Sequence, residues 1–358
     1  MKLFNPLQTH RLPALALAAA LLGSSLPAWA QDESADEAPR QALNSEIMPL
    51  ATKGIINDVA RRGSGYVAVG ERGHILLSDD AENWEQVVGP TRAMLNRVQF
   101  VDAQHGWAVG YDGAVLKTAD GGQSWTLNRF EPDWGKPWYD LLFADAQTGL
   151  VAGANGRMLA TQDGGESWTA VENDVFETGF HHYDVALLND GSLLIAGERG
   201  FLARSTDDGC TWEMLQPPYI GSYFGILPHG PRGAVVYGLQ GRVFAFDDVT
   251  ALPTVAEPLD YDPFSAENVT DPQALAAMGW RQLQNPVEES LFGATMNGSD
   301  QAVFVGVDGS IVRGELSGQT LEAVRDWGSD DPLSDIELRA GQAVMTGRGG
   351  FYSIDSPL

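Results

Sequence analysis

A short glycine turn that recurs seven times is the feature that most restricts the fold of this 358-residue chain. Each copy is one residue followed by Gly-x-x-Gly, the first at Val69–Gly73 and the last at Thr346–Gly350. The steps between successive copies are 40, 43, 44, 41, 68 and 41 residues. An apolar stretch precedes the turn and another follows it, which predicts two antiparallel strands. A repeat near 42 residues that is built of strands is typical of a propeller blade, because solenoid repeats of that length are helical.

A second turn, of the form Ser/Thr-x-Asp-x-Gly-x-x-Trp, follows the glycine turn in the middle of the chain. Residues 118–125, 161–168 and 205–212 match it fully, and residues 78–84 form a copy one residue shorter. An aspartate in so tight a turn can accept hydrogen bonds from the amides of its own turn, and a tryptophan can pack between neighbouring repeats. We therefore expect structural roles, not catalytic ones, for Asp80, Asp120, Asp163, Asp207, Trp84, Trp125, Trp168 and Trp212.

These motifs make the chain similar to the Asp-box, or bacterial neuraminidase repeat, propellers. Within them it most resembles the family related to the photosystem II stability and assembly factor. The resemblance covers nearly all of the chain after residue 30, although the Asp-box is degenerate or lost in the last three copies. It implies a non-catalytic assembly factor whose arginine-bearing face binds an immature membrane subunit. Arg72 and Arg199 occupy the matching turn positions, and Arg348 is displaced by one residue.

The predicted fold is all-β: residues 45–358 form a seven-bladed β-propeller with four-stranded antiparallel blades. The long step of 68 residues indicates an insertion at residues 250–279 of blade five, with a short helix over residues 271–278, in place of an Asp-box loop. Blade seven offers three strands, at residues 336–338, 342–346 and 350–354. Because an open sheet edge is unfavourable, we expect residues 46–51 to supply the fourth strand and to close the ring.

The N-terminal residues predict export. Basic residues precede an apolar run at residues 12–22, and Ala28-Trp29-Ala30 is typical of a signal-peptidase site, so residues 1–30 are predicted to be a cleaved signal peptide. A retained anchor is the alternative, but the run is short for a membrane span. Residues 31–44 are predicted to be a disordered acidic leader. We expect a periplasmic protein.

The net charge excludes one class of partner. The whole chain carries a formal charge of -26, which becomes -28 without Lys2 and Arg11 of the predicted signal peptide. Such a surface repels nucleic acid and anionic lipid headgroups. We therefore expect no nucleic-acid partner and, at most, a peripheral position at a membrane.

A four-stranded antiparallel blade places its turns on two faces. The glycine turns, between the second and third strands, share one face with the connections between blades; the Asp-boxes and the insertion share the other. The first face, called the turn face below, combines arginines with aromatic residues, the composition of protein–protein contacts. The predicted partner-binding residues are Arg72, Arg157, Arg199, Arg242, Arg348, Trp134, Trp138, Tyr139, His181, His182, Tyr219 and Tyr223. The alternative is that these aromatic side chains pack between blades and that the arginines pair with Glu71, Asp112 and Glu198.

Three function classes remain. The first is a non-catalytic propeller that docks on the exported domain of an inner-membrane protein or complex; the resemblance extends to relatives in non-photosynthetic bacteria, which makes transporters of the resistance-nodulation-division type one partner class. The second is a sialidase-like glycoside hydrolase, but the Arg-Ile-Pro motif is absent and sialidases have six blades. The third is a propeller that binds a carbohydrate or a peptide through its channel. The histidines lack metal-ligand spacing and no phosphate-binding glycine loop is present, so we expect no metal and no cofactor.

Overall fold

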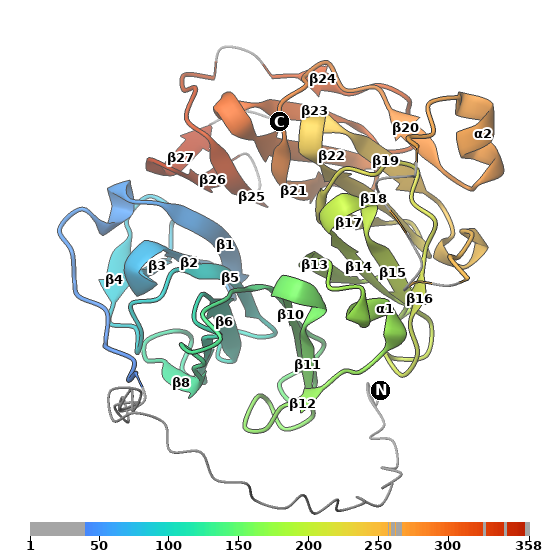
Figure 1. Cartoon of the computed structure of the whole chain (residues 1–358). Coiled ribbons are helices and arrows are strands. Elements are labelled where there is room, and N and C mark those ends of the chain that lie inside the picture. The colour runs from blue at the N-terminus through green and yellow to red at the C-terminus, as the bar shows by residue number, and fades with distance from the viewer. Residues whose placement is uncertain are drawn as a thin grey trace, which may run out of the picture.

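The computed structural model describes residues 40–256, 258, 262, 267–324, 327–339 and 342–354. Among them, the strands form seven antiparallel sheets arranged as the blades of a ring (Figure 1), and inner strands of six blades line a cavity at its centre, called the channel below. The predicted seven-bladed propeller is confirmed, with four strands in blades one to six. The predicted signal peptide and residues 31–39 of the predicted leader lie outside the described residues.

Strands within a blade follow one another in sequence order, so the first strand of each blade lies next to the channel and the last at the rim. Blades one to three hold β1 (Ile56–Arg62), β2 (Gly65–Gly70), β3 (Ile75–Ser78) and β4 (Glu85–Val87); β5 (Leu95–Phe100), β6 (Gly106–Gly110), β7 (Val115–Thr118) and β8 (Thr126–Arg129); β9 (Trp138–Phe143), β10 (Gly149–Gly153), β11 (Met158–Thr161) and β12 (Thr169–Ala170). Blades four to seven hold β13 (His182–Leu187), β14 (Leu193–Gly197), β15 (Leu202–Ser205) and β16 (Glu213–Met214); β17 (Tyr223–His229), β18 (Gly233–Gly238), β19 (Val243–Phe246) and β20 (Arg281–Leu283); β21 (Leu291–Asn297), β22 (Gln301–Gly306), β23 (Ile311–Glu315) and β24 (Glu322–Ala323); β25 (Leu333–Arg339), β26 (Gln342–Gly347) and β27 (Gly350–Ile354). The described residues also form the α-helices α1 (Asp174–Glu177) and α2 (Pro272–Ala277).

The last residue of the glycine turn must be glycine for a steric reason that is shared between blades. In blade one the turn is the 3-10 helix η2 (Glu71–Gly73), in which Arg72 has a φ of 55° and Gly73 a φ of 69°. A Cβ atom added to Gly73 would lie 2.0 Å from the carbonyl oxygen of Thr91, in the connection to the next blade. Gly156 stands in the same relation to the carbonyl oxygen of Phe176. The repeated glycine therefore lets each turn lie against the backbone that enters the neighbouring blade.

The core lies between the blades. The second strands β2, β6, β10, β14 and β18 are buried along their whole length, because both faces of each sheet pack on a neighbouring sheet. Aromatic pairs join adjacent blades: Trp107 stacks on Phe143 with ring centroids 3.7 Å apart, and Trp84 stacks on Phe351 at 3.9 Å. The second pair spans blades one and seven.

The predicted fourth strand of blade seven is wrong: among the described residues, its sheet holds β25, β26 and β27, and residues 46–51 form no strand in it. This segment lies along the rim of blade one instead, where the Ser45 N–H donates to the Gly89 carbonyl (2.8 Å) and the Met48 N–H to the Gln86 side chain (2.7 Å). The chain must then cross to β1 beside the channel, and the 3-10 helix η1 (Ala51–Lys53) occupies that crossing. Since η1 contacts β27 and β1 contacts β25 and β26, the ring closes by packing.

The insertion of blade five lies between β19 and β20, as its sequence position requires, but it does not stay on the Asp-box face. Thr254 forms a β-bridge with Leu215 at the rim of blade four, and the Val269 N–H donates to the Pro218 carbonyl, in the connection to blade five. The predicted helix is present as α2, capped by Asp271 and anchored by the buried Leu275. The described part of the insertion thus extends along the rim toward the turn face, because its apolar residues bury themselves between blades four and five.

Candidate functional site

The five predicted arginines lie at or beside the glycine turns, and their surroundings divide them. Arg72, Arg242 and Arg348 are exposed and, within the described part of the chain, form no ion pair. Arg199 is partly exposed and lies 3.4 Å from a carboxylate oxygen of its neighbour Glu198. Arg157 is different, since its guanidinium binds both carboxylate oxygens of Glu131 at 2.6 and 3.0 Å. Four arginines are therefore accessible on the turn face.

Arg157 belongs to a packed cluster. Its guanidinium lies over the ring of Trp134 at 4.7 Å and over that of Trp138 at 5.2 Å, within the range of cation–π contacts. Glu131 also accepts from Arg129 (2.5 Å). Arg157 thus joins the turn of blade three to the connection that precedes it, which gives it a positioning role in the fold.

The aromatic residues of the predicted partner-binding face need a correction. Trp138, His182, Tyr219 and Tyr223 are buried, so they are not part of the exposed surface. Three of them are the first residues of β9, β13 and β17, where the side chain turns into the adjacent blade. His182 stacks on Phe201 (4.7 Å), and burial lowers its pKa to about 3, so it is a neutral core residue. Trp134, Tyr139 and His181 remain partly exposed.

Each inner strand begins with a β-bulge at its second residue. In blade one, Ile56 pairs with Gly70 but Asp58 pairs with Val69, which leaves Asn57 unpaired. A bulge bends the strand and redirects a side chain. Since the inner strands surround the channel and begin on the turn face, the bulged residues lie around its mouth on that face. They are Asn57, Asn96, Tyr139, Tyr183, Phe224, Phe292 and Ser334.

Four of these seven residues are aromatic and come from the consecutive blades three to six, a set called the aromatic arc below. Ring centroids are 5.0 Å apart for Tyr139 and Tyr183, 5.4 Å for Tyr183 and Phe224, and 5.2 Å for Phe224 and Phe292. All four are partly exposed. On the other side of the mouth, Asn57 and Asn96 donate to backbone carbonyls of the next blade, each at 2.8 Å.

The third residue of the inner strand forms a charged layer across the channel in five blades and is a glycine in blades five and six. Asp58, Arg97, Asp140, Asp184 and Asp335 hold this position in blades one to four and seven, a set called the carboxylate layer below. Arg97 lies 3.2 Å from Asp58, 3.0 Å from Asp140 and 3.6 Å from Asp184. Sequence reasoning missed this layer, although its signal was visible as a charged residue 12 or 13 positions before the first glycine of the turn in five of the seven copies.

The carboxylate layer also joins neighbouring blades. Asp58 accepts from the Val98 N–H at 2.7 Å, Asp140 from the Val185 N–H at 2.8 Å, and Asp184 from the Ile226 N–H at 2.6 Å. Asp335 accepts from the Val59 N–H at 3.2 Å, across the junction of blades seven and one. Burial, and next the facing Asp140, raise the pKa of Asp184 well above its ordinary value. Burial and Asp58 do the same to Asp335.

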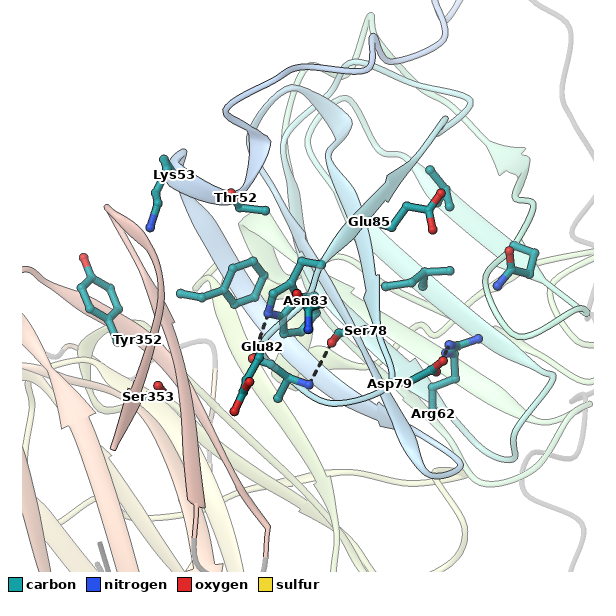
Figure 2. Close-up of a pocket in the computed structure, with 16 residues that line it drawn as sticks. Thr52, Lys53, Arg62, Ser78, Asp79, Glu82, Asn83, Glu85, Tyr352 and Ser353 are labelled. Atoms are coloured by element: carbon teal, nitrogen blue, oxygen red, sulfur yellow. Dashed lines mark hydrogen bonds and ion pairs between the residues drawn. The ribbon is translucent and has the colours of Figure 1, made fainter. Parts of the chain in front are cut away.

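A cavity of about 710 Å³ lies at the junction of blades seven and one on the Asp-box side (Figure 2). Figure 2 shows Tyr352 and Ser353 of β27 on one side and the first Asp-box, with Glu82 and Asn83, on the other. Its charged residues have mixed sign, and Arg62 is already paired with Asp79 at 3.2 Å. None of the predicted partner-binding residues lines this cavity.

The Asp-box residues hold their own turns. Asp163 accepts from the Ser167 N–H (2.8 Å) and hydroxyl (2.6 Å), and these bonds, the hydroxyl first, lower its pKa. Asp120 and Asp207 make the same pair of contacts, and Asp80 accepts from the amides of Glu82 and Asn83. The tryptophans lie in the core between blades: Trp125 and Trp212 are buried, and Trp84 and Trp168 are partly buried. Among the described residues, no group of three or more His, Cys, Asp or Glu side chains has the arrangement of a metal site.

Comparison with known proteins agrees with the repeat and the fold. The sequence profile of the family described as photosynthesis system II assembly factor YCF48 matches residues 76–134 and 129–250, which run from blade one into blade five. The photosystem II assembly protein Ycf48 of Thermosynechococcus vestitus is 41% identical over 46 residues, 13% of this chain and 13% of that protein. The photosystem II stability/assembly factor HCF136, chloroplastic, of Cyanidioschyzon merolae is 38% identical over 76 residues, 19% of this chain and 17% of that protein. The aligned part thus spans less than a fifth of either relative.

Solved structures extend the likeness of the fold to nearly the whole chain. YCF48 bound to D1 peptide has a TM-score of 0.62 at 18% identity and covers 88% of this chain and 99% of that one. YCF48 from Cyanidioschyzon merolae has a TM-score of 0.64 at 15% identity and covers 86% and 98%. At these identities the likeness shows the fold alone; the WD40 propeller of Doa1 reaches 0.61 at 11% identity.

Seven blades and repeated Asp-boxes define the chain as an Asp-box β-propeller. The family profile, over residues 76–250, and the two curated relatives show that it is similar to the photosystem II stability/assembly factor-like family of these propellers.

Proposed function

We propose that the protein is a non-catalytic periplasmic accessory factor that binds the exported domain of an inner-membrane protein or complex and helps it to assemble or work. Transporters of the resistance-nodulation-division type are one partner class. The observation that carries this proposal is the set of four accessible arginines on the turn face of a propeller that is similar to this family. A solved structure with the same fold is YCF48 with a D1 peptide bound, so a propeller of this shape can hold a peptide segment.

The surface chemistry supports a protein partner. Arg72, Arg199, Arg242 and Arg348 come from blades one, four, five and seven, so they spread around the face. Guanidinium groups form bidentate contacts with carboxylates and stack on aromatic rings. Partly exposed Tyr139 and Trp134 lie on the same face. An extended partner segment would contact several blades at once.

The periplasmic location rests on the sequence of residues 1–30, a basic start followed by an apolar run and an Ala-x-Ala site. Among the described residues, no helix is long and apolar enough to cross a membrane.

The assignment as non-catalytic rests on the channel. Sialidase-type chemistry requires arginines that are free to clamp a substrate carboxylate, whereas Arg97 is already bound by Asp58 and Asp140. The remaining described carboxylates of the layer accept backbone hydrogen bonds, which is a structural role.

The test is an affinity pull-down from solubilised membranes with the mature protein and with Arg72→Glu plus Arg199→Glu. The matched control, Arg61→Glu plus Arg232→Glu, makes the same charge change on exposed arginines toward the opposite face. We expect one membrane protein to be recovered by the parent and the control and to be lost with the turn-face variant. Recovery that is unchanged by the turn-face variant, or no recovery by any of the proteins, would contradict the proposal.

A further inference from the structure

We propose that the mouth of the channel on the turn face binds one cationic side chain, a lysine or an arginine of the partner segment, between the aromatic arc and the carboxylate layer. That the cation belongs to a protein partner rests on the proposed function. That the site prefers a cation rests on the structure of the mouth. The inner strands β9, β13, β17 and β21, which carry the arc, are labelled in Figure 1.

The arc has the size of a cation site. Its successive ring centroids are 5.0, 5.4 and 5.2 Å apart. If all seven bulge positions had this spacing, each centroid would lie about 6 Å from the channel axis, which is the reach of a cation–π contact. A cation near the axis would therefore be within reach of several rings, and a small shift toward blades four and five would bring it closer to Tyr183 and Phe224.

The floor of the mouth has the sign that a cation requires. Four buried or nearly buried carboxyl groups face one guanidinium in the carboxylate layer. Burial raises the pKa of Asp184 and Asp335, and the carboxyl groups of the layer outnumber its single guanidinium by four to one. Burial raises the pKa of both Tyr139 and Tyr183, and the negative charge of Glu198 adds to this rise at both hydroxyls. An anionic side chain would be repelled, and a neutral apolar one would contact the rings without gaining from this field.

The charges farther out on the turn face indicate which residues would flank such a side chain in the partner. The accessible arginines lie on turns between the second and third strands, farther from the axis than the bulges at the start of the first strands. The turn face therefore has an acidic, aromatic centre and basic groups farther out. A partner segment with one basic residue between acidic residues would match this pattern.

The first experiment uses the mature protein without its partner and two matched probes, Nα-acetyl-lysine methylamide and Nα-acetyl-norleucine methylamide, which differ in the charged amine. Binding is followed by titration calorimetry and by NMR shifts of the tyrosine and phenylalanine rings. We expect saturable binding of the lysine probe at the arc and binding of the norleucine probe that is weaker by about tenfold. Equal binding of both probes would show an apolar site, and no binding of the lysine probe would also overturn the proposal.

The second experiment changes the arc. Tyr183→Leu plus Phe224→Leu keeps apolar side chains but removes two rings, and Phe130→Leu removes a partly buried ring at the rim. We expect the arc variant to lose the lysine probe and the rim variant to keep it; unchanged binding by the arc variant would contradict the site. In the membrane pull-down, recovery of a partner by a protein that binds no lysine probe would overturn this inference and leave the proposed function standing. Binding of the lysine probe without recovery of any partner would support the cation site and contradict the proposed function.

Discussion

Aspartate side chains experience two opposite environments in this ring. At the Asp-box turns, hydrogen bonds from the Ser167 hydroxyl and amide lower the pKa of Asp163, so the folded state prefers the ionised form. This contribution to stability is present above the unfolded pKa and is lost as the pH falls through the lowered one. In the channel, burial raises the pKa of Asp184 and Asp335, so the folded state prefers the neutral form there. That contribution is present at low pH and is lost as the pH rises.

Replacement of an Asp-box aspartate should cost stability as the loss of a capping side chain does. We expect Asp163→Ala to lower the free energy of unfolding by about 1 kcal/mol, because two turn contacts of Ser167 lose their acceptor. Urea unfolding at neutral pH measures the effect. The control is Asp133→Ala, an exposed turn residue. A cost no larger than that of the control would show that the turn does not depend on its aspartate.

Asp184→Asn should become more favourable as the pH rises. The amide oxygen can still accept from the Ile226 N–H, while the costly ionisation of a buried carboxyl is removed. We expect the difference in unfolding free energy between the variant and the parent to shift toward the variant between about pH 5 and about pH 8. Asp140→Asn is the contrast: it weakens the ion pair with Arg97 and should destabilise at both pH values. A pH-independent difference for Asp184→Asn would show that this carboxyl is already ionised.

At the scale of elements, the blade is more uniform than its sequence copies suggest. Ile56, Leu95, Trp138, His182 and Leu333 differ in chemistry, yet all are buried at the first position of an inner strand. The bulge then presents the second residue at the mouth, and the third joins the layer or is a glycine. The same backbone pattern therefore places three consecutive residues of each inner strand in the core, at the mouth of the channel and at the level of the charged layer.

The edge of blade seven should exchange its amide hydrogens faster than the equivalent strands. The third strands β3, β7, β11, β15, β19 and β23 pair on both sides, whereas β27 pairs only with β26 among the described residues. An amide without a partner strand is protected less, because no second ladder must open. We expect faster hydrogen–deuterium exchange in residues 350–354 than in β15, measured by mass spectrometry. Protection equal to that of β15 would mean that another segment pairs with this edge.

At the scale of the whole molecule, the ring was predictable and its interior was not. The last glycine of each Gly-x-x-Gly copy lies so close to a neighbouring segment of the chain that a Cβ atom would clash. Each blade has one such turn, so the number of copies predicts the number of blades. Tyr223 and His182 look like surface aromatics in the sequence, because the neighbouring blade that buries them is distant along the chain. The crossing of residues 49–54 depends on where the rim lies relative to β1, which no local pattern records. Asp58 and Asp335 look like ordinary polar residues of a strand, although they meet at the junction of blades one and seven.

Replacement of Arg97 should destabilise the whole propeller, since its guanidinium holds carboxyl groups of three other blades in the channel. Arg97→Met keeps much of the side-chain volume but leaves Asp58 and Asp140 buried without a countercharge. Loss of one partner from a buried ion pair costs about 3–5 kcal/mol, and the cost should grow with pH because deprotonation of the layer is no longer compensated.

The rescue variant separates charge from packing. Arg97→Met combined with Asp58→Asn and Asp140→Asn removes the uncompensated carboxylates while their side chains can still accept from the amides of Val98 and Val185. We expect the triple variant to regain most of the stability lost by Arg97→Met in urea unfolding. A triple variant as unstable as the single one would show that Arg97 acts by filling the channel, and a single variant as stable as the parent would show that the carboxylate layer does not hold the ring together.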